Sequence, residues 1–353
     1  MTTLRNIVRT GAGPAGQLLR FLARRHRTLS PLLIMTHDHP DPDALAAAYG
    51  LHYLAREAFG VESTIVYRGA VGRAENRDMV RILEIPARRL RAGDIERQRR
   101  VALVDTQPLF ENNPFPARRR ATIVIDQHPS VVEPSADLSL VDATCGATCV
   151  IVAQALLRSG LRIPKKLATA LAYGILSDTL DLYRARRQDI IDTYLSLLAG
   201  CDIRSLARIR NPAHSRRFFV SLSRAVRNAT SRGPLLASHL GPIDNPDLVS
   251  QTAELLLTYE KARWVLCTGR YEGRLHLSLR TSGTRTSAGR ILRDLATDHR
   301  DVGGHGAIAG GSLQVGRQAP EETWAAIERD FQHRLARRLR IPSRGGFRRI
   351  FLE

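Results

Sequence analysis

Short apolar runs, each followed by polar or turn residues, recur in the first half of the chain and constrain its fold most strongly. These β-rich runs are residues 32–35, 63–68, 101–105 and 121–126. They do not alternate polar and apolar residues, which is typical of strands buried on both faces of a parallel sheet. Segments of helical composition follow at residues 44–60, 146–159 and 164–178. The sequence therefore predicts an α/β domain in which helices flank a parallel sheet.

The length of the chain, 353 residues, exceeds the usual size of one domain and predicts two. Near residue 200 the pattern changes to an arginine-rich helical stretch, and beyond it short strands alternate with a helix, as in a smaller mixed sheet. The expected division is a basic N-terminal extension at 1–30, an α/β domain at 31–200, a helical linker at 201–232, a smaller mixed α/β domain at 233–318, and a peripheral C-terminal helix with a basic tail at 319–353.

A formal net charge of +19 favours an anionic partner, such as nucleic acid, a nucleotide or polyphosphate. Nearly all of this charge is arginine, because lysine occurs only at Lys165, Lys166 and Lys261. Such uneven usage also fits codon bias and a merely solvated basic surface, so both interpretations stay open at this point.

Cysteine spacing and hydropathy predict the compartment. Four scattered cysteines without a CxxC pair indicate neither a disulfide scaffold nor a structural zinc site. No apolar run approaches the roughly 18 residues that span a bilayer, and the first residues lack the apolar core of a signal peptide. We therefore expect no membrane partner and a cytoplasmic location.

The segment 37–43 places two imidazoles and three carboxylates within seven positions at the end of a predicted strand. In open α/β sheets, loops beyond the carboxyl ends of strands form the ligand crevice. Pro40 and Pro42 are expected to hold Asp41 and Asp43 in extended backbone, where residues two apart are expected to serve two different metal ions. The alternative is a solvated turn, although such turns seldom collect histidine as well.

Three more acids stand at comparable places: Asp105 ends one apolar run, Asp126 ends another, and Asp178 lies in YGILSDT. One such aspartate alone is often a helix cap or a turn former. Several in a single domain predict a metal centre. Carboxylates with imidazole suit Mn²⁺, and two such ions would activate a water molecule for hydrolysis of a phosphate ester.

Five ordered segments carry a resemblance to a known family. THDHPDPDA, VALVDT, VIDQHP and YGILSDT are similar to the four motifs of the DHH phosphoesterases, and GGHGAIAGG at 303–311 is similar to the glycine loop of their C-terminal substrate module. That family includes RecJ-type exonucleases, nano-RNase/pAp phosphatases, cyclic-dinucleotide phosphodiesterases and family II pyrophosphatases. The resemblance spans residues 32–315 and implies a DHH domain at 31–200 with a DHH-associated domain at 233–318.

The resemblance also implies a role for each motif residue. One Mn²⁺ would be held by His37, Asp41 and Asp105, and a second by Asp43, Asp105 and Asp178. Asp126 would support the site, and His128 would contact the scissile phosphate. The substrate phosphate or the nucleotide end would be held by Arg280, Gly303, Gly304 and His305. From the residues themselves, Arg73 and Asn76 are further candidate anion contacts near a helix start, with an ordinary surface helix as the alternative.

One position departs from the family pattern. Where the family has Asp-His-His, this chain has Asp126-Gln127-His128, and the missing histidine is normally a metal ligand. A glutamine can coordinate through its amide oxygen but binds transition metals more weakly. Three outcomes are open: Gln127 as an oxygen ligand, an altered metal preference, or a weakened enzyme. We expect the first, because the other motif acids are intact.

The minimal two-domain architecture resembles the nano-RNase/pAp-phosphatase branch and implies a phosphoesterase acting on short RNA or DNA oligonucleotides or nucleotide phosphates. The main enzymatic alternative is a cyclic-dinucleotide phosphodiesterase, whereas a pyrophosphatase is less favoured. The alternative from another class is a non-catalytic nucleotide- or RNA-binding protein with a degenerate metal site at Gln127. A homodimer is among the assemblies that the sequence leaves open.

Overall fold

The computed structural model describes residues 12–130, 132–283, 287–296, 302–342 and 345–351. The chain forms two compact units, Met1–Ala213 and His214–Glu353. The segment 201–232, for which we expected a single helical linker, is divided between them. Helix α9 (Ile203–Arg210) belongs to the first unit and helix α10 (Arg216–Arg227) to the second.

The first unit contains a six-stranded parallel sheet in the order β3-β2-β1-β4-β5-β6. Its strands are β1 (Leu32–Thr36), β2 (Ser63–Tyr67), β3 (Ala87–Arg89), β4 (Arg100–Val104), β5 (Ala121–Asp126) and β6 (Ala136–Val141). The four predicted runs form β1, β2, β4 and β5, which confirms the α/β class. The edge strands β3 and β6 were not predicted from the sequence.

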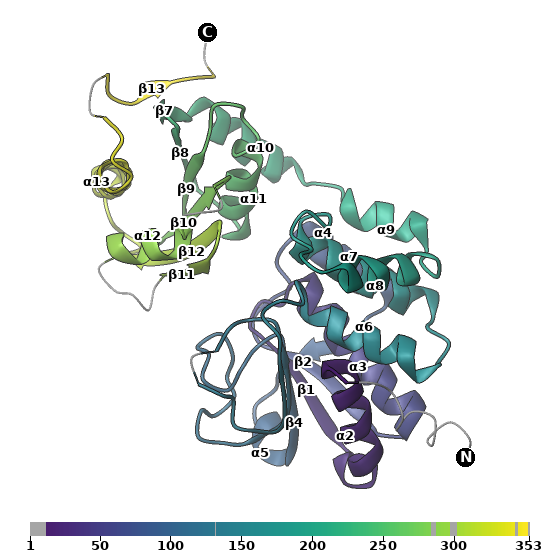
Figure 1. Ribbon diagram of the computed structural model, residues 1–353. Helices are drawn as coiled ribbons and strands as arrows, with labels where there is room; N and C mark the ends of the chain where they lie inside the picture. The colour runs from purple at the N-terminus through teal and green to yellow at the C-terminus, as the bar shows by residue number, and fades with distance from the viewer. Residues whose placement is uncertain (1–11, 131, 284–286, 297–301, 343–344, 352–353) are drawn as a thin grey trace. The chain divides into compact units, whose positions relative to one another are not determined.

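Helices pack mainly against one face of this sheet (Figure 1). They are α2 (Pro14–Leu29), α3 (Pro42–Phe59), α6 (Thr148–Ser159) and α7 (Lys165–Thr179), with α4 (Ala74–Leu83) and α8 (Gln188–Leu198) beside them. The opposite face is covered by Ile95 of the short helix α5 (Asp94–Arg97) and by Phe115. Both faces are therefore buried, as the unbroken apolar strands require.

Two sequence expectations for this unit are corrected. The N-terminal segment is more than an extension, since α2 buries Leu18, Leu19 and Leu22 in the same core as the sheet. Asp43 is not in extended backbone, because α3 begins one residue earlier. Asp41 caps that helix by accepting a hydrogen bond from the amide of Ala44 at 2.9 Å. A proline is well suited to the first position of a helix, where no hydrogen bond to its nitrogen is needed.

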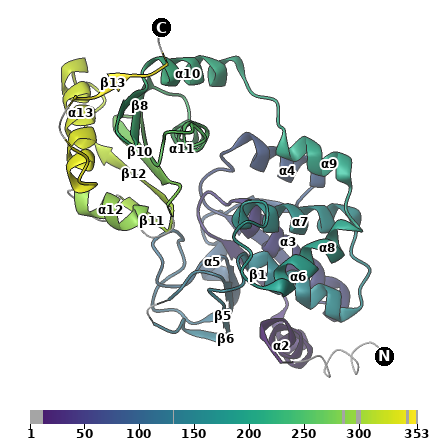
Figure 2. The same cartoon turned by 45° about the horizontal axis from the view of Figure 1, so that its top comes forward.

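The second unit is built on a seven-stranded sheet in the order β11-β12-β10-β9-β8-β7-β13, in which, among the described strands, only the β8–β9 pair is parallel. Its strands are β7 (Thr230–Arg232), β8 (Leu235–Pro242), β9 (Trp264–Tyr271), β10 (Arg274–Thr281), β11 (Val302–His305), β12 (Ile308–Gln314) and β13 (Arg348–Arg349). Helices α10 and α11 (Asp247–Leu256) cover one face, and α12 (Ala288–Leu295) and α13 (Glu321–Arg338) cover the other (Figure 2).

Two further expectations differ here. The glycine-rich segment is a β-hairpin, with Gly303 paired to Gly310 across β11 and β12, rather than a loop. The C-terminal helix is not peripheral, because Phe331 and Leu335 of α13 are fully buried against the sheet. Strand β13 also pairs with β7, so the end of the chain is part of the second unit.

No helix in the described part of the chain is both long and apolar enough to span a membrane.

Candidate metal centre

The candidate centre lies at the carboxyl edge of the central strands of the first unit. His37 directly follows β1, Asp105 directly follows β4, and Asp126 is the last residue of β5. These three strands are neighbours in the order β1-β4-β5, so their ends meet at one edge of the sheet. The local backbone at Asp105 is left-handed, with a φ of 59°, which is uncommon outside glycine and turns the chain sharply at the strand end.

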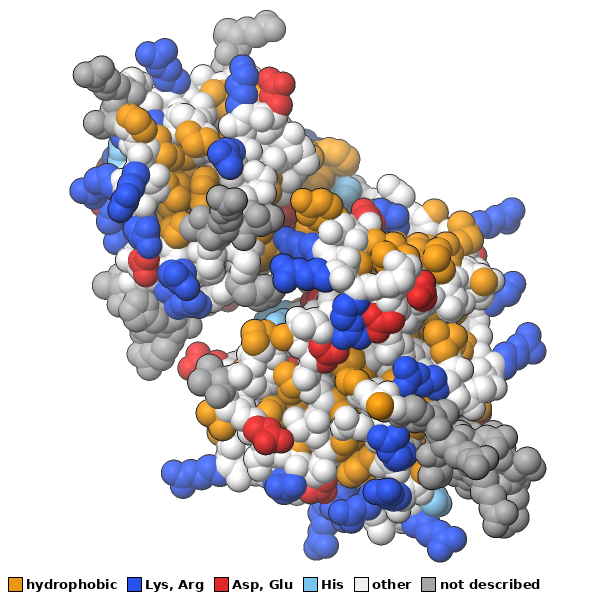
Figure 3. Space-filling model, in the orientation of Figure 1, with side chains coloured by type: hydrophobic (Ala, Val, Ile, Leu, Met, Phe, Trp, Pro, Cys, Tyr) orange, Lys and Arg blue, Asp and Glu red, His pale blue; other side chains and the backbone are white. Residues whose placement is uncertain are grey.

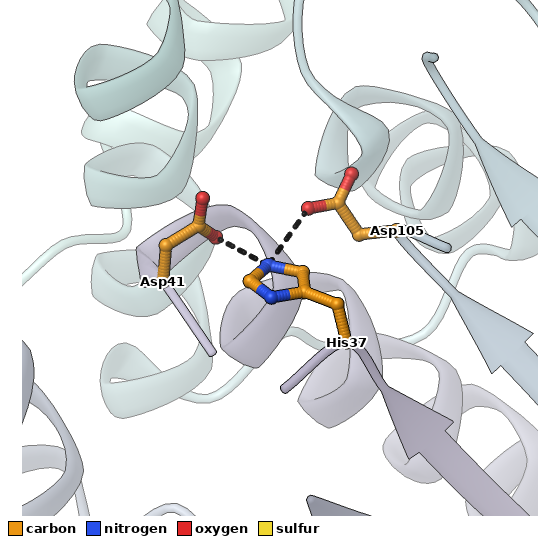
Figure 4. Close-up of side chains that lie close together, drawn as sticks. All are labelled: His37, Asp41 and Asp105. Atoms are coloured by element: carbon orange, nitrogen blue, oxygen red, sulfur yellow. Dashed lines mark ion pairs between the residues drawn. The ribbon is translucent and has the colours of Figure 1, made fainter. Parts of the chain in front are cut away.

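One candidate ligand group consists of His37, Asp41 and Asp105 (Figure 4). The Nε2 atom of His37 lies 3.7 Å from Asp41 Oδ1 and 3.5 Å from Asp105 Oδ2. On the other side of the ring, Nδ1 donates to the carbonyl oxygen of Asp38 at 2.8 Å. This bond fixes the tautomer that keeps Nε2 available as a ligand, as in many histidine metal sites.

A second candidate group consists of Asp105, Asp126 and His128. The Nδ1 atom of His128 lies 2.8 Å from Asp126 Oδ1 and 3.6 Å from Asp105 Oδ1. Asp105 therefore belongs to both groups and presents one carboxylate oxygen to each. A carboxylate in this position is able to bridge two cations.

The remaining predicted ligands lie beside these groups. Asp43 is fully buried and accepts hydrogen bonds from the backbone amides of Thr148 at 2.6 Å and Cys149 at 2.7 Å. The side-chain amide of Gln127 donates to Asp178 and to Asp43, the latter at 3.3 Å. Gln127 thus lies between the two acids with which a second ion was expected. Rotating its amide by half a turn would present an oxygen to the same position.

The carboxylates of the centre are crowded, and their pKa values report this. Burial raises the pKa of Asp43 well above its usual range, and the charges of Asp105, Asp178 and Asp41 raise it further. The pKa of Asp178 is raised in the same direction, by burial and then by the charges of Asp41 and Asp105. Crowded acids of this kind need protons or a cation to offset their charge, so the residues present fit a divalent metal.

The pKa values of the two histidines, His37 and His128, are also raised. Burial alone would lower the pKa of His37, but hydrogen bonds and charges from Asp105 and Asp41 outweigh it, and the pKa is raised well above normal. For His128, burial is likewise outweighed, by the hydrogen bond to Asp126 and by the charge of Asp105, and its pKa is raised to about 9. Without a cation, both histidines and the buried acids Asp43 and Asp178 therefore keep their protons to a higher pH than the same side chains do in water.

Sequence reasoning missed two residues that hold the acids in place. Thr148, the first residue of α6, donates its hydroxyl to Asp105 Oδ1 at 2.6 Å. Gln107 donates its side-chain amide to Asp126 Oδ2 at 2.7 Å and to the carbonyl oxygen of His128 at 2.8 Å. Gln107 lies two residues after Asp105, so its position next to a motif residue is the one sequence feature that could have identified it. Thr148 carried none, because its proximity depends on long-range packing.

The other predicted contacts lie elsewhere. Asn76 is buried in the first turn of α4 and Arg73 is half-buried before it, 3.7 Å from Glu75, and neither belongs to the two ligand groups. Arg280, Gly303 and Gly304 belong to the second unit and line a pocket there. The side chain of His305 falls outside the described part of the chain.

The positive charge of the protein is not gathered at one place on the visible surface. Figure 3 shows Lys and Arg side chains spread over that surface, interspersed with acidic and apolar ones. The charge therefore favours the approach of anions in general and does not by itself mark a binding site.

Comparison with known proteins matches residues 31–175 to the family described as DHH family, N-terminal domain. An uncharacterized protein of Methanocaldococcus jannaschii, MJ1633, is 31% identical over 288 residues, covering 81% of this chain and 59% of that protein. A probable manganese-dependent inorganic pyrophosphatase of Streptococcus pyogenes is 26% identical over 154 residues, covering 43% of this chain and 49% of that protein. The matched part of this chain thus spans 49% to 59% of the length of these relatives.

Solved structures share the fold over most of the chain. An exopolyphosphatase-related protein from Bacteroides fragilis aligns with a TM-score of 0.70 at 14% identity, covering 92% of this chain and 97% of that one. RecJ from Thermus thermophilus, solved in complex with Mn²⁺, aligns with a TM-score of 0.54 at 15% identity, covering 96% of this chain and 57% of that one. At these identities the likeness concerns the fold alone.

Proposed function

This chain belongs to the DHH superfamily, and from that premise we propose that it is a metal-dependent phosphoesterase that hydrolyses short oligonucleotides or nucleotide phosphates. The observation that carries the proposal is the shared carboxylate of Asp105. This carboxylate belongs to both candidate ligand groups, one with His37 and Asp41 and the other with Asp126 and His128. Two adjacent cation sites with carboxylate and imidazole ligands are suited to the hydrolysis of a phosphate ester.

The proposed cofactor is a pair of Mn²⁺ ions. Manganese suits a mixed set of carboxylates and imidazoles, and it is named for the pyrophosphatase relative and for the RecJ structure. His37, Asp41 and Asp105 would hold one ion. Asp43, Asp105 and Asp178 would hold the other, with an oxygen of Gln127, and the group of Asp105, Asp126 and His128 is the alternative second site. When bound, the ions would supply a water molecule of lowered pKa and an electrostatic clamp on the phosphate.

The residues around the ions have roles of their own. Asp126 accepts a hydrogen bond from Nδ1 of His128 at 2.8 Å, and this bond orients the ring. In the protonated imidazole, the opposite ring nitrogen would donate a hydrogen bond to a phosphate oxygen as negative charge builds there. Gln107 holds both residues of this pair, because it donates to the Asp126 carboxylate and to the His128 carbonyl.

The substrate class rests on the nucleotide-handling members of the superfamily. RecJ shares the fold over nearly the whole of this chain, and the high arginine content favours a polyanion. Cyclic dinucleotides are the nearest rival substrates. Pyrophosphate is less favoured, since the likeness to the pyrophosphatase covers less than half of this chain.

A substrate panel tests the proposal. The protein with Mn²⁺ is incubated with 5′-labelled RNA dimers to pentamers, with pAp, with cyclic dinucleotides and with pyrophosphate, and the products are separated. Release of mononucleotides from the short RNAs, or of phosphate from pAp, is the expected result. Turnover of pyrophosphate alone would contradict the proposed substrate class.

A second candidate function follows from Gln127. Its amide group donates to both Asp43 and Asp178, as a neutral substitute for a cation would. A protein with that arrangement would bind nucleotides without hydrolysing them. Metal analysis separates the two functions, because the enzyme is expected to hold about two Mn²⁺ per chain. One or none, together with no turnover on any substrate of the panel, would favour the binding protein.

A further inference from the structure

The loop that follows β4 carries two apolar side chains beside the candidate metal centre. It spans residues 106–113 and begins directly after Asp105. Leu109 is 59% exposed, and the next residue, Phe110, is half-buried. A single exposed leucine is ordinary on a protein surface. Two apolar side chains next to a cluster of acids and imidazoles are less expected, because such a centre attracts charged ligands.

A ring contact with His128 places Phe110 at this centre. The two rings pack edge to face, with their centroids 6.5 Å apart and an angle of 77° between their planes. His128 belongs to the second candidate ligand group, with Asp105 and Asp126, and it is the residue that we propose to contact the phosphate. A single side chain therefore separates the Phe110 ring from the position proposed for the reacting phosphate.

The backbone of this loop is held from the inside by Asn113. That residue is buried, and its side-chain amide donates to the Thr106 hydroxyl at 2.8 Å and to the Phe110 carbonyl at 3.1 Å. Its side-chain oxygen accepts a hydrogen bond from the backbone amide of Phe115 at 3.0 Å. A buried amide whose donor and acceptor atoms are paired fixes the conformation of the chain around it. The position of Phe110 is thus set by its backbone as well as by the packing of its ring.

The same loop is also fixed to the segment that carries the first ligand group. The carbonyl oxygen of Asn112 accepts a hydrogen bond from the backbone amide of Asp38 at 2.6 Å, and Asp38 directly follows His37. The side-chain oxygen of Asn112 accepts a hydrogen bond from the Thr106 hydroxyl at 2.7 Å. The loop that carries Phe110 therefore has a fixed position relative to both candidate ligand groups, and a surface that is ordered in advance costs less to bind.

An aromatic surface at this place favours only some phosphate compounds. An imidazolium or a bound cation attracts any phosphate group, whether inorganic or organic. The side chains of Phe110 and Leu109 carry neither a charge nor a hydrogen-bonding group, so they add little to the binding of phosphate or pyrophosphate. The face of a nucleobase, by contrast, stacks on aromatic side chains. The chemistry of the loop thus fits a ligand that has both a phosphate and a planar ring.

We propose that Phe110 is a stacking surface for the base of the nucleotide whose phosphate lies at the centre, with Leu109 extending its apolar area. The inference rests on the proposed function, because it states how the first unit would favour nucleotides over inorganic phosphates. Every base has a flat face, so this contact selects for the presence of a base and not for its identity.

Equilibrium binding of a hydrolysis product tests this inference. The full-length protein with Mn²⁺ is titrated calorimetrically with AMP and with ribose 5-phosphate, which has the same phosphate and sugar but no base. AMP is expected to bind about tenfold more tightly than ribose 5-phosphate, and the other three ribonucleoside 5′-monophosphates are expected to bind within about fivefold of AMP. Phe110→Ala should lower the affinity for AMP about 5- to 100-fold and leave the affinity for ribose 5-phosphate unchanged.

Two further variants at the same position separate stacking from apolar bulk. Phe110→Tyr keeps the face of the ring and should retain most of the affinity for AMP. Phe110→Leu keeps an apolar side chain without a ring and should lose affinity as Phe110→Ala does. Phe219→Ala, the same substitution at an exposed position, is the matched control and should bind AMP as the unaltered protein does. Thermal melts establish that each variant is folded.

Three results of these titrations would overturn the inference. The first is equal binding of AMP and ribose 5-phosphate to the unaltered protein. The second is a Phe110→Ala variant that binds AMP like the control variant. The third is full affinity for AMP in Phe110→Leu, because the contact would then not be stacking.

Turnover of an RNA dimer distinguishes stacking from a merely structural role of Phe110. Stacking predicts that Phe110→Ala raises KM and leaves kcat within about twofold of the unaltered protein. A lower kcat together with unchanged affinity for AMP would show that the ring only positions His128, and would overturn the inference.

The same measurements separate this inference from the proposed function. Binding of AMP that depends on Phe110, without turnover of any substrate in Mn²⁺, would support the stacking surface and overturn the phosphoesterase. Turnover with a KM that is unchanged in Phe110→Ala would support the phosphoesterase and overturn the stacking surface.

Discussion

At the scale of single residues, Asp105 is the central side chain of the candidate metal centre. Its two carboxylate oxygens lie near different histidines, and one of them also accepts a hydrogen bond from Thr148. Gln127 departs from the Asp-His-His motif that the resemblance implies, and its amide lies between Asp43 and Asp178.

Replacing that glutamine by histidine tests how the proposed second ion would be held. Gln127→His is expected to raise the affinity for a second Mn²⁺, because imidazole is a stronger ligand than an amide oxygen. Titration calorimetry, together with metal analysis after dialysis, measures this. The exposed Gln188→His is the control and should bind metal as the unaltered protein does. A drop in metal content in Gln127→His would show that the amide itself is the better ligand.

Metal binding is expected to release protons. The pKa values of Asp43, Asp178 and His37 are raised, and that of His128 is about 9, so these groups are protonated in the metal-free protein at pH values below their pKa. Ligands must lose their protons to bind, so the apparent affinity for Mn²⁺ should rise with pH between 6 and about 9. Calorimetry in two buffers of different ionisation enthalpy counts the protons, and a buffer-independent heat would refute the charged cluster.

At the scale of elements, α6 positions the acids through its first turn. Thr148 contributes a hydroxyl to Asp105 and a backbone amide to Asp43, and Cys149 contributes a second amide to Asp43. The start of a helix, with its free amide groups and its positive dipole end, is a suitable place to hold a buried carboxylate.

Thr148 allows this positioning to be tested with matched variants. Thr148→Val keeps the shape and removes the hydroxyl, whereas Thr148→Ser keeps the hydroxyl. The valine variant is expected to bind Mn²⁺ roughly 10- to 100-fold more weakly, because the supporting hydrogen bond to Asp105 is lost. The serine variant should retain most of the affinity. If both variants bind alike, the hydroxyl does not position Asp105.

The second unit offers a prediction about α13, which the sequence led us to regard as peripheral. Phe331 is fully buried between α13 and the sheet, so Phe331→Ala should lower the free energy of unfolding by about 3–5 kcal/mol. Phe219 on α10 is 57% exposed, and Phe219→Ala should change it by less than about 0.5 kcal/mol. Urea unfolding measures both, and equal effects would refute the packing of α13.

The strands that the sequence predicted are the buried ones, and the strands that it did not predict are half-exposed. Strands β1, β4 and β5 are buried on both faces and therefore appear as unbroken apolar runs. The edge strands β3 and β6 are half-exposed and mixed in composition, so no such run marks them. The glycine hairpin was misjudged because glycine favours turns in general, whereas here cross-strand pairing of β11 and β12 decides the conformation.

At the scale of the molecule, the ordered motifs predicted the family and the unbroken apolar runs predicted the parallel sheet, since both signals depend on local sequence. The structure brings several of the motif residues together at one edge of the sheet, and their roles as metal ligands stay a prediction. The supporting contacts of Thr148 and Gln107, and the ring contact of Phe110 with His128, depend on pairings between distant segments, which a single sequence does not reveal. The boundary after Ala213 was missed because α9 and α10 have similar compositions.

The most direct test of the centre compares Asp105→Ala with the exposed control Asp192→Ala in the release of mononucleotides from a labelled RNA trimer with Mn²⁺. Because Asp105 belongs to both ligand groups, its loss is expected to lower kcat/KM at least about a thousandfold, while the control variant keeps full activity. An Asp105→Ala variant that remains folded and retains more than about a tenth of the activity would contradict a centre built on this carboxylate.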